Sequence, residues 1–324
     1  MLKLPSLMIQ RTIRKMSASD VFHFSLISPE HLECVRRTRG HALSGAEITL
    51  VVRTPELMEI EFKPVDANVG KIIISVENIE RAAEYILKNE KLDQEINGFP
   101  MKIALYGNNP TVYIPSGFNS KIALINCCFE NLQCQGISLH FESPSHQMSI
   151  YQPLVKTFKQ CLELKIKCYT GLQSNVDTER FLSDVQISRK FHLYQHSVEP
   201  LKLPLSVFSA NNVLINSTIV MTRETLLSIN CEYASFSRTS ITSEDLSAFV
   251  VKWFNSDGTR FKRLIVETEI SFEPLDLSTI PGQYIEPMEN GKTKILRADG
   301  TFAVVIFDRQ FFDFRVSDEE VKFR

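Results

Sequence analysis

The sequence lacks a long hydrophobic run. Its longest uncharged apolar stretch covers only residues 302–307, whereas a helix that crosses a bilayer needs about 20 apolar residues. No secretory signal is expected at the start, because Lys3, Pro5, Gln10 and Arg11 interrupt any apolar segment there. Seven cysteines are an odd number for a disulfide framework. We therefore expect reduced thiols in a cytoplasmic or nuclear protein without a membrane partner.

An excess of charge of either sign is also missing. The chain has 36 Lys and Arg residues against 38 Asp and Glu residues, and the two signs are interspersed. Nucleic-acid-binding domains usually carry a clustered basic surplus, so no nucleic-acid partner is expected. The apolar fraction of 44% and the charged fraction of 23% are typical of a soluble globular protein. A chain of 324 residues can form one large domain or two to three smaller ones.

The common catalytic and metal-binding motifs are absent from the sequence. It has no glycine-rich phosphate loop, no Gly-x-Ser-x-Gly turn and no His-Glu-x-x-His pair. The cysteines do not have the Cys-x-x-Cys spacing of structural zinc sites; this holds for Cys127, Cys128 and Cys134 and for Cys161 and Cys168. We therefore predict a protein that is not an enzyme, with no catalytic residues, metal ligands or cofactor.

The first forty residues predict three short helices. Apolar side chains recur every three to five residues from Leu4 to Met16, which is typical of one face of a helix, and Pro5 suits its first turn. Residues 17–20 can cap a second helix, and the pair at residues 28–29 can begin a third. Helices this short cannot bury their apolar side chains among themselves, so some of them must pack on something else.

This stretch resembles the F-box, the module that binds the small Skp adaptor of cullin–RING ubiquitin ligases. The matching motifs are Leu4-Pro5, Met8, Ile9, Ile13, Met16, Asp20-Val21-Phe22 and Ser25-Leu26-Ile27-Ser28. The resemblance assigns residues 1–40 to an F-box and implies the adaptor contacts Leu4, Pro5, Met8, Ile9, Ile13, Phe22 and Ile27. The alternative is an ordinary N-terminal helical cap with a Leu-Pro start.

Residues 45–135 predict a mixed β/α segment after a polar joint at residues 38–46. Alternating β-branched residues on either side of short turns indicate two hairpins, and a strand followed by a helix lies between them. The hairpins are expected at residues 48–52 with 58–62 and at 103–106 with 111–114, the strand at 71–76 and the helix at 77–89.

From residue 136 to residue 324 strands alternate with helices. Six strands are expected to begin near Ile137, Glu163, Lys190, Asn212, Cys231 and Lys262. Successive starts differ by 26, 27, 22, 19 and 31 residues, which brackets the 20–29 residues of leucine-rich repeats. The expected fold class is therefore α+β or α/β: a short N-terminal three-helix F-box followed by an irregular leucine-rich-repeat-like α/β domain with β-hairpins. A single irregular α/β sheet would give nearly the same pattern.

The strongest helix signal lies at residues 243–254. Cap candidates and acidic residues precede an apolar stripe at positions i, i+3, i+4, i+7 and i+8. The stripe consists of Leu246, Phe249, Val250, Trp253 and Phe254. An aromatic stripe with this spacing indicates a core helix more often than a binding groove.

A second resemblance covers residues 200–310 approximately. Residues 222–231, 240–253 and 260–264, with a closing hairpin at 296–303, are similar to the type-2 F-box-associated domain. That domain follows an F-box in a very large family of nematode proteins. Together the two resemblances imply a substrate-receptor subunit of an SCF-type cullin–RING ubiquitin ligase, which binds the Skp adaptor and a target protein. The alternatives are a leucine-rich-repeat-like scaffold outside ubiquitylation and a hydrolase or transferase on an α/β sheet.

Alternation along the expected strands suggests where a target protein would bind. If the strands lie side by side, their outward residues form one continuous face that mixes charged and aromatic side chains. The candidates are Lys165, Lys167, His192, Tyr194, Tyr233 and Arg263.

Overall fold

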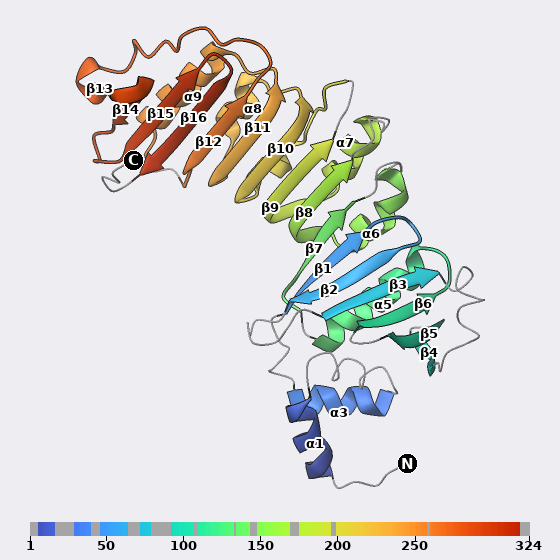
Figure 1. Cartoon of the computed structure of the whole chain (residues 1–324). Helices are drawn as coiled ribbons and strands as arrows, with labels where there is room; N and C mark the ends of the chain where they lie inside the picture. Colours follow the sequence, from blue (N-terminus) through green and yellow to red (C-terminus); the bar gives the residue numbers. More distant parts are fainter. Residues whose placement is uncertain are drawn as a thin grey trace. The chain divides into compact units, whose positions relative to one another are not determined.

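A computed structural model gives the fold of two compact units (Figure 1). The first unit comprises residues 1–146 and 150–162, and the second comprises 147–149 and 163–324. The structure describes residues 6–16, 29–39, 46–63, 72–78, 92–96, 98–106, 109–132, 134–142, 148–168, 175–195, 199–257 and 260–317.

Two helices near the N-terminus begin the first unit. Helix α1 (Ser6–Lys15) packs on α3 (Pro29–Arg39), and Pro29 occupies the first position of α3, where a helix needs no backbone donor. Ile13 of α1 and Val35 of α3 are buried, whereas Met8 of α1 is 55% exposed. The helix expected after residues 17–20 falls outside the described residues.

The rest of the first unit is a mixed β-sheet. Its strand order is β7-β1-β2-β3-β6-β5-β4. The strands are β1 (Glu47–Val52), β2 (Met58–Lys63), β3 (Ile72–Asn78), β4 (Leu92–Ile96), β5 (Phe99–Tyr106), β6 (Asn109–Ile114) and β7 (Gly136–Phe141). Among the described residues, the other helical elements are α5 (Phe118–Leu132), α6 (Gln152–Thr157) and the 3-10 helix η1 (Met148–Tyr151), whose first two residues belong to the second unit.

Both hairpins expected in this unit are confirmed. Strands β1 and β2 pair antiparallel, as do β5 and β6, while β1 pairs with β7 and β3 with β6 in parallel. The sequence did not predict the antiparallel pair of β4 and β5, which meets at Gly98 with a φ of +82°. Of the helix expected at residues 77–89, Glu77 and Asn78 belong to strand β3, and the remainder lies outside the described residues.

The second unit is also built on a mixed sheet. Its strand order is β13-β14-β15-β16-β12-β11-β10-β9-β8. The strands are β8 (Gln160–Cys168), β9 (Gln186–Gln195), β10 (Asn212–Ile219), β11 (Tyr233–Thr239), β12 (Arg263–Glu267), β13 (Ile285–Pro287), β14 (Lys292–Leu296), β15 (Phe302–Asp308) and β16 (Phe311–Ser317). Strands β9 to β12 pair in parallel, and β12, β16, β15, β14 and β13 pair antiparallel in that order.

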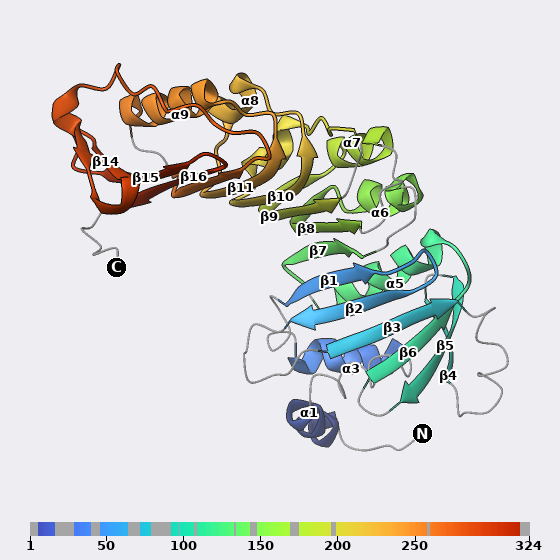
Figure 2. The same ribbon diagram turned by 45° about the horizontal axis from the view of Figure 1, so that its top comes forward.

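Helices of the second unit cover one face of its sheet. Helices α7 (Asn175–Ser183), α8 (Arg223–Ser228) and α9 (Ser243–Asn255) lie on the same side of the strands (Figure 2). The described part of the unit also contains the 3-10 helices η2 (Leu205–Ser209), η3 (Gly282–Tyr284) and η4 (Glu289–Gly291). The alternation of buried and half-buried residues along β9 to β12 fits a sheet with a single covered face.

The centre of the second core is the contact between α9 and β16. The ring of Trp253 lies 5.1 Å from that of Phe314, and the ring of Phe249 lies 5.5 Å from it, both edge to face. Arg297 also contacts Trp253: its guanidinium carbon lies 5.3 Å from the centre of the Trp253 ring, a cation–π distance. The helix expected at residues 243–254 and its role as a core element are confirmed.

The expected fold class was wrong. The described part of the chain is mostly mixed β-sheet with few helices, which does not match a three-helix F-box followed by a leucine-rich-repeat-like α/β domain. A leucine-rich repeat stacks parallel strands only, whereas half of the second sheet and much of the first are antiparallel. The spacing was misleading because helices separate the parallel strands β9 to β12, and this produces intervals of a similar length.

Replacing Trp253 by alanine should destabilise the second unit strongly. Truncation of a buried tryptophan typically costs about 3–5 kcal/mol, because it removes ring contacts and leaves a cavity. We expect a loss of that size in the free energy of unfolding, measured by denaturant titration. Ile270, which is 75% exposed, provides the control: Ile270→Ala should change stability by less than about 0.5 kcal/mol. Equal stability of Trp253→Ala and the parent would contradict the core assignment.

Candidate protein-interaction surface

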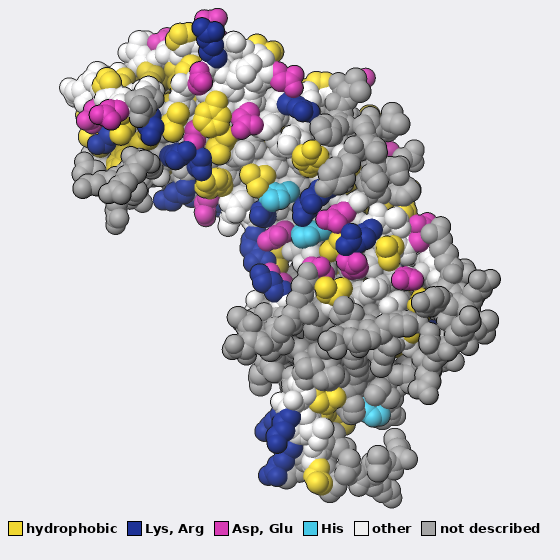
Figure 3. Space-filling model, in the orientation of Figure 1, with side chains coloured by type: hydrophobic (Ala, Val, Ile, Leu, Met, Phe, Trp, Pro, Cys, Tyr) yellow, Lys and Arg dark blue, Asp and Glu magenta, His cyan; other side chains and the backbone are white. Residues whose placement is uncertain are grey.

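The sheet of the second unit has a face opposite its helices. Residues of this face stand side by side because the strands are in register: His192 pairs with Leu214, Leu214 with Ser235, and Ser235 with Ile265. All four side chains are half-buried, whereas the residues that precede and follow them on each strand are mostly buried under helices. In Figure 3 the face over β9 to β12 mixes hydrophobic, charged and polar side chains.

A shallow hollow of about 470 Å³ lies on this face over strands β8 to β11. Side chains from the four strands line it, among them Lys165, Lys167, His192, Tyr194, Leu214 and Asn216. The structure therefore brings together four of the six residues proposed from the sequence for target binding. Whether they bind a target stays a prediction.

The other two candidates, Tyr233 and Arg263, belong to a polar cluster farther along the same sheet. Arg263 donates to both carboxylate oxygens of Asp313 at 2.8 Å and to the hydroxyl of Tyr233 at 2.8 Å. Arg315 donates to Asp313 from Nε at 2.9 Å. Asp313 is fully buried. The two guanidinium groups balance its charge in place of water.

The surroundings of Asp313 determine its ionisation. Burial by itself would raise the pKa of this carboxyl, but the hydrogen bonds and charges of Arg263 and Arg315 outweigh it and lower the pKa below its usual value. The pKa of Arg263 is raised, chiefly by its hydrogen bond to Asp313. The sequence reasoning missed Asp313 and Arg315; an acidic residue between Phe312 and Phe314 in a strand was the available signal.

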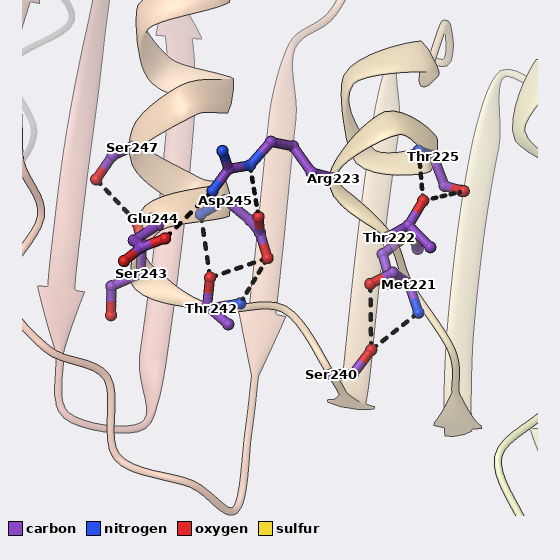
Figure 4. Close-up of polar contacts among 10 residues, drawn as sticks. All are labelled: Met221, Thr222, Arg223, Thr225, Ser240, Thr242, Ser243, Glu244, Asp245 and Ser247. Atoms are coloured by element: carbon purple, nitrogen blue, oxygen red, sulfur yellow. Dashed lines mark hydrogen bonds and ion pairs between the residues drawn. The ribbon is translucent and has the colours of Figure 1, made fainter.

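Side-chain caps fix the loops that lead from these strands into helices α8 and α9 (Figure 4). Thr222 accepts a hydrogen bond from the backbone amide of Thr225 at 3.2 Å, and Thr242 accepts one from Asp245 at 3.3 Å. The carboxylate of Asp245 in turn accepts from the amide of Thr242 at 3.0 Å, which completes a capping box. These bonds supply acceptors for amides that the first turn of a helix leaves without one.

The two capped loops are also joined to each other. The Ser240 hydroxyl exchanges hydrogen bonds with the backbone of Met221, both at 3.1 Å (Figure 4). Arg223 donates to Asp245 at 2.8 Å and to Glu244 at 3.4 Å. Burial of Asp245 opposes its ionisation, but the bonds from Thr242 and Arg223 outweigh it and lower its pKa. The network holds α8 and α9 side by side on the covered face.

The residues expected to bind an adaptor are only partly described. Met8 is exposed on α1, whereas Ile13 is 1% exposed. A partner can contact Ile13 only if the residues that bury it move away. Ile9 lies within α1. Leu4, Pro5, Phe22 and Ile27 fall outside the described residues. Adaptor binding stays a prediction for all seven.

No metal centre is visible in the described part of the chain, where no three His, Cys, Asp or Glu side chains gather to hold an ion. The cysteines are free thiols, and burial raises the pKa of Cys134 and of Cys231 to about 12. Among the described helices, none is long and apolar enough to cross a membrane. The residues that line the hollow over β8 to β11 can contact a partner through basic, hydroxyl, amide and ring groups.

Comparison with known proteins gives one match. Residues 206–266 match the model of the family described as F-box associated. The chain therefore carries an F-box-associated domain. No curated protein and no solved structure matches the chain.

The F-box-associated domain begins within η2 and ends within β12, and so includes both capped helices, β10, β11 and nearly all of β12. The resemblance noted at residues 200–310 is confirmed for this part. Tyr233 and Arg263 lie within the domain, whereas Lys165, Lys167, His192 and Tyr194 precede it. The hollow therefore joins β10 and β11 of the F-box-associated domain to the two strands before it.

Replacing Asp313 by asparagine should reduce stability in a pH-dependent way. Removing one partner of a buried ion pair typically costs about 3–5 kcal/mol at neutral pH. Because the folded-state pKa of Asp313 is lowered, the stability that its charge contributes is present above the unfolded pKa, about 3.9, and is lost as pH falls through the folded pKa. The difference between parent and Asp313→Asn should therefore shrink below about pH 4.

The measurement is the free energy of unfolding of both proteins from pH 7 to pH 3. Asp257→Asn, at an exposed position of the same unit, is the control and should follow the parent at every pH. A constant difference between Asp313→Asn and the parent across this range would contradict the ion-pair account.

Proposed function

We propose that this protein is a substrate-receptor subunit of an SCF-type cullin–RING ubiquitin ligase. The observation that carries the proposal is the F-box-associated domain at residues 206–266. The resemblance of residues 1–40 to an F-box supports it independently, because the two segments lie in the order that such receptors have. The chain itself performs no chemistry in this proposal.

The adaptor side of the proposal rests on the N-terminal helices. An apolar side chain exposed on a short amphipathic helix is a suitable anchor for a partner, and Met8 of α1 is 55% exposed. The Skp adaptor would cover this side of α1. The contacts proposed are Leu4, Pro5, Met8, Ile9, Ile13, Phe22 and Ile27.

The target side rests on the helix-free face of the second unit. Its mixture of aromatic, basic and polar side chains suits a protein partner. A receptor of this kind accelerates ubiquitin transfer by proximity, since it holds a lysine of the target near an E2 thioester on another subunit. Rigid attachment of the surface to a packed sheet favours this role, because a fixed target orientation raises the effective concentration of that lysine.

The adaptor contact can be tested by co-purification of the tagged full-length protein with the Skp adaptor. Met8→Asp places a charge in the proposed apolar contact and should weaken adaptor binding by about 30-fold or more, the equivalent of about 2 kcal/mol. Arg11→Ala on the same helix is the control and should retain the adaptor, because the contact depends on apolar area.

Circular dichroism should show that both variants keep the parent's fold, since Met8 and Arg11 are exposed. If the parent does not co-purify with the adaptor at all, the proposed function is wrong. If Met8→Asp binds as well as Arg11→Ala does, the N-terminal contact is wrong.

A further inference from the structure

A second hollow lies on the helix-covered side of the second sheet. Its volume is about 710 Å³, within the range of about 300–1,000 Å³ that is usual for binding pockets. Val305 and Phe307 of β15 line it, and Val305 pairs with Phe314. Paired residues point to the same face of a sheet, and Phe314 contacts Trp253 of α9. The second hollow is therefore separate from the helix-free face described above.

One wall of the second hollow is a segment without regular structure. Residues 271–277 form no helix, strand or turn, and most of them line the hollow. The amides of Phe272 and Asp276 anchor the segment to the turn after β15 and to α9, at 2.6 and 3.0 Å. Between these anchors, the backbone amides and carbonyls of Glu273 and Leu275 make no hydrogen bond within the described part of the chain. The wall therefore offers donors and acceptors to a second backbone.

Part of the lining is apolar. The ring centres of Phe272 and Phe307 lie 5.8 Å apart, and Val305 is buried next to them on the same strand as Phe307. Leu275 and Leu277 of the wall are half-buried. An aliphatic side chain of a bound segment can be buried here while its backbone pairs with the wall. Strand addition combines affinity and specificity in this way.

The charged part of the lining consists of two carboxylates and one guanidinium. Glu273 and Asp308 carry the negative charges, and Arg309 carries the positive one. Within the described chain the side chains of Glu273 and Arg309 make no hydrogen bond or ion pair, and Asp308 accepts only from the backbone amide of Arg309, at 2.6 Å. One negative charge is therefore in excess. This surplus favours a basic side chain over an acidic one.

We infer that the second hollow binds an extended segment of a partner protein in which aliphatic and basic residues alternate. The segment adds its backbone to residues 273–275, and its aliphatic side chains contact Leu275 and Phe307. Its basic side chains lie near Glu273 and Asp308. Most of the lining lies outside the F-box-associated match at 206–266, and the inference does not rest on the proposed function.

The test measures binding of a fluorescent nine-residue peptide of alternating Lys and Val to the full-length protein. We expect saturable binding, and a peptide of alternating Glu and Val should bind about tenfold more weakly or less, because the surplus charge repels it. Glu273→Lys should weaken binding of the lysine peptide by about tenfold. Glu232→Lys, at an exposed position outside the second hollow, is the charge-matched control and should bind within about twofold of the parent.

The backbone contact is tested without changing the protein. The lysine peptide N-methylated at every amide keeps its side chains and charge but has no backbone donors, and it should bind about tenfold more weakly or less. Glu273→Gln removes the charge and keeps the shape of the side chain, so it should weaken the lysine peptide by about threefold even if Glu273→Lys disturbs folding. Circular dichroism checks the fold of each variant.

Four results would overturn the inference: no saturable binding to the parent, equal binding of the lysine and glutamate peptides, equal binding of the N-methylated peptide, or an equal loss in the Glu232→Lys control. The Skp adaptor plays no part in these measurements. Failure of this inference therefore leaves the proposed function as it stands, and failure of adaptor co-purification leaves the peptide result as it stands.

Discussion

The second unit depends on burying one face of its sheet under helices. Trp253 and Phe249 of α9 pack edge to face on Phe314 of β16, and the parallel strands turn their buried residues to the same side. Because side chains alternate along a strand, each residue buried in this way places its neighbours on the opposite face. The candidate interaction surface is therefore a direct consequence of core packing, and its residues are held by a backbone that the core fixes.

Asp313 connects the two parts of this sheet. Its strand, β16, pairs antiparallel with β12, the last parallel strand, and its carboxylate binds Arg263 across that pair. Burying an ionised carboxylate without partners would cost several kcal/mol of folding free energy. The two arginines offset this cost for Asp313. The cluster orders Tyr233 as well, through the bond from Arg263, and so reaches from β16 to β11.

Local hydrogen bonds fix the starts of the two helices in the F-box-associated domain. The caps at Thr222 and Thr242 begin α8 and α9, and Arg223 joins the two helix starts through Asp245. Exposed ion pairs contribute little stability each, whereas caps contribute about 1 kcal/mol. Placement of the helices over β10, β11 and β12 therefore depends on buried contacts first and on the caps second. Strands β10 and β11 of this domain and strands β8 and β9 before it form one surface. This surface is larger than the part that the domain contributes.

Local patterns in the sequence determined the elements. All six strands expected between residues 136 and 267 are present, the helix ending in Trp253 and Phe254 is α9, and the hairpin at Asp299-Gly300 joins β14 to β15. Alternation alone also placed Lys165, Lys167, His192 and Tyr194 on one face, because side chain direction follows from the period of a strand. Only the tertiary structure decided the order and direction of the strands, which overturned the repeat architecture, and only it brought Asp313 to Arg263. The contact of Asp313 with Arg263 joins residues 50 positions apart, and such a contact leaves no periodic trace in the sequence.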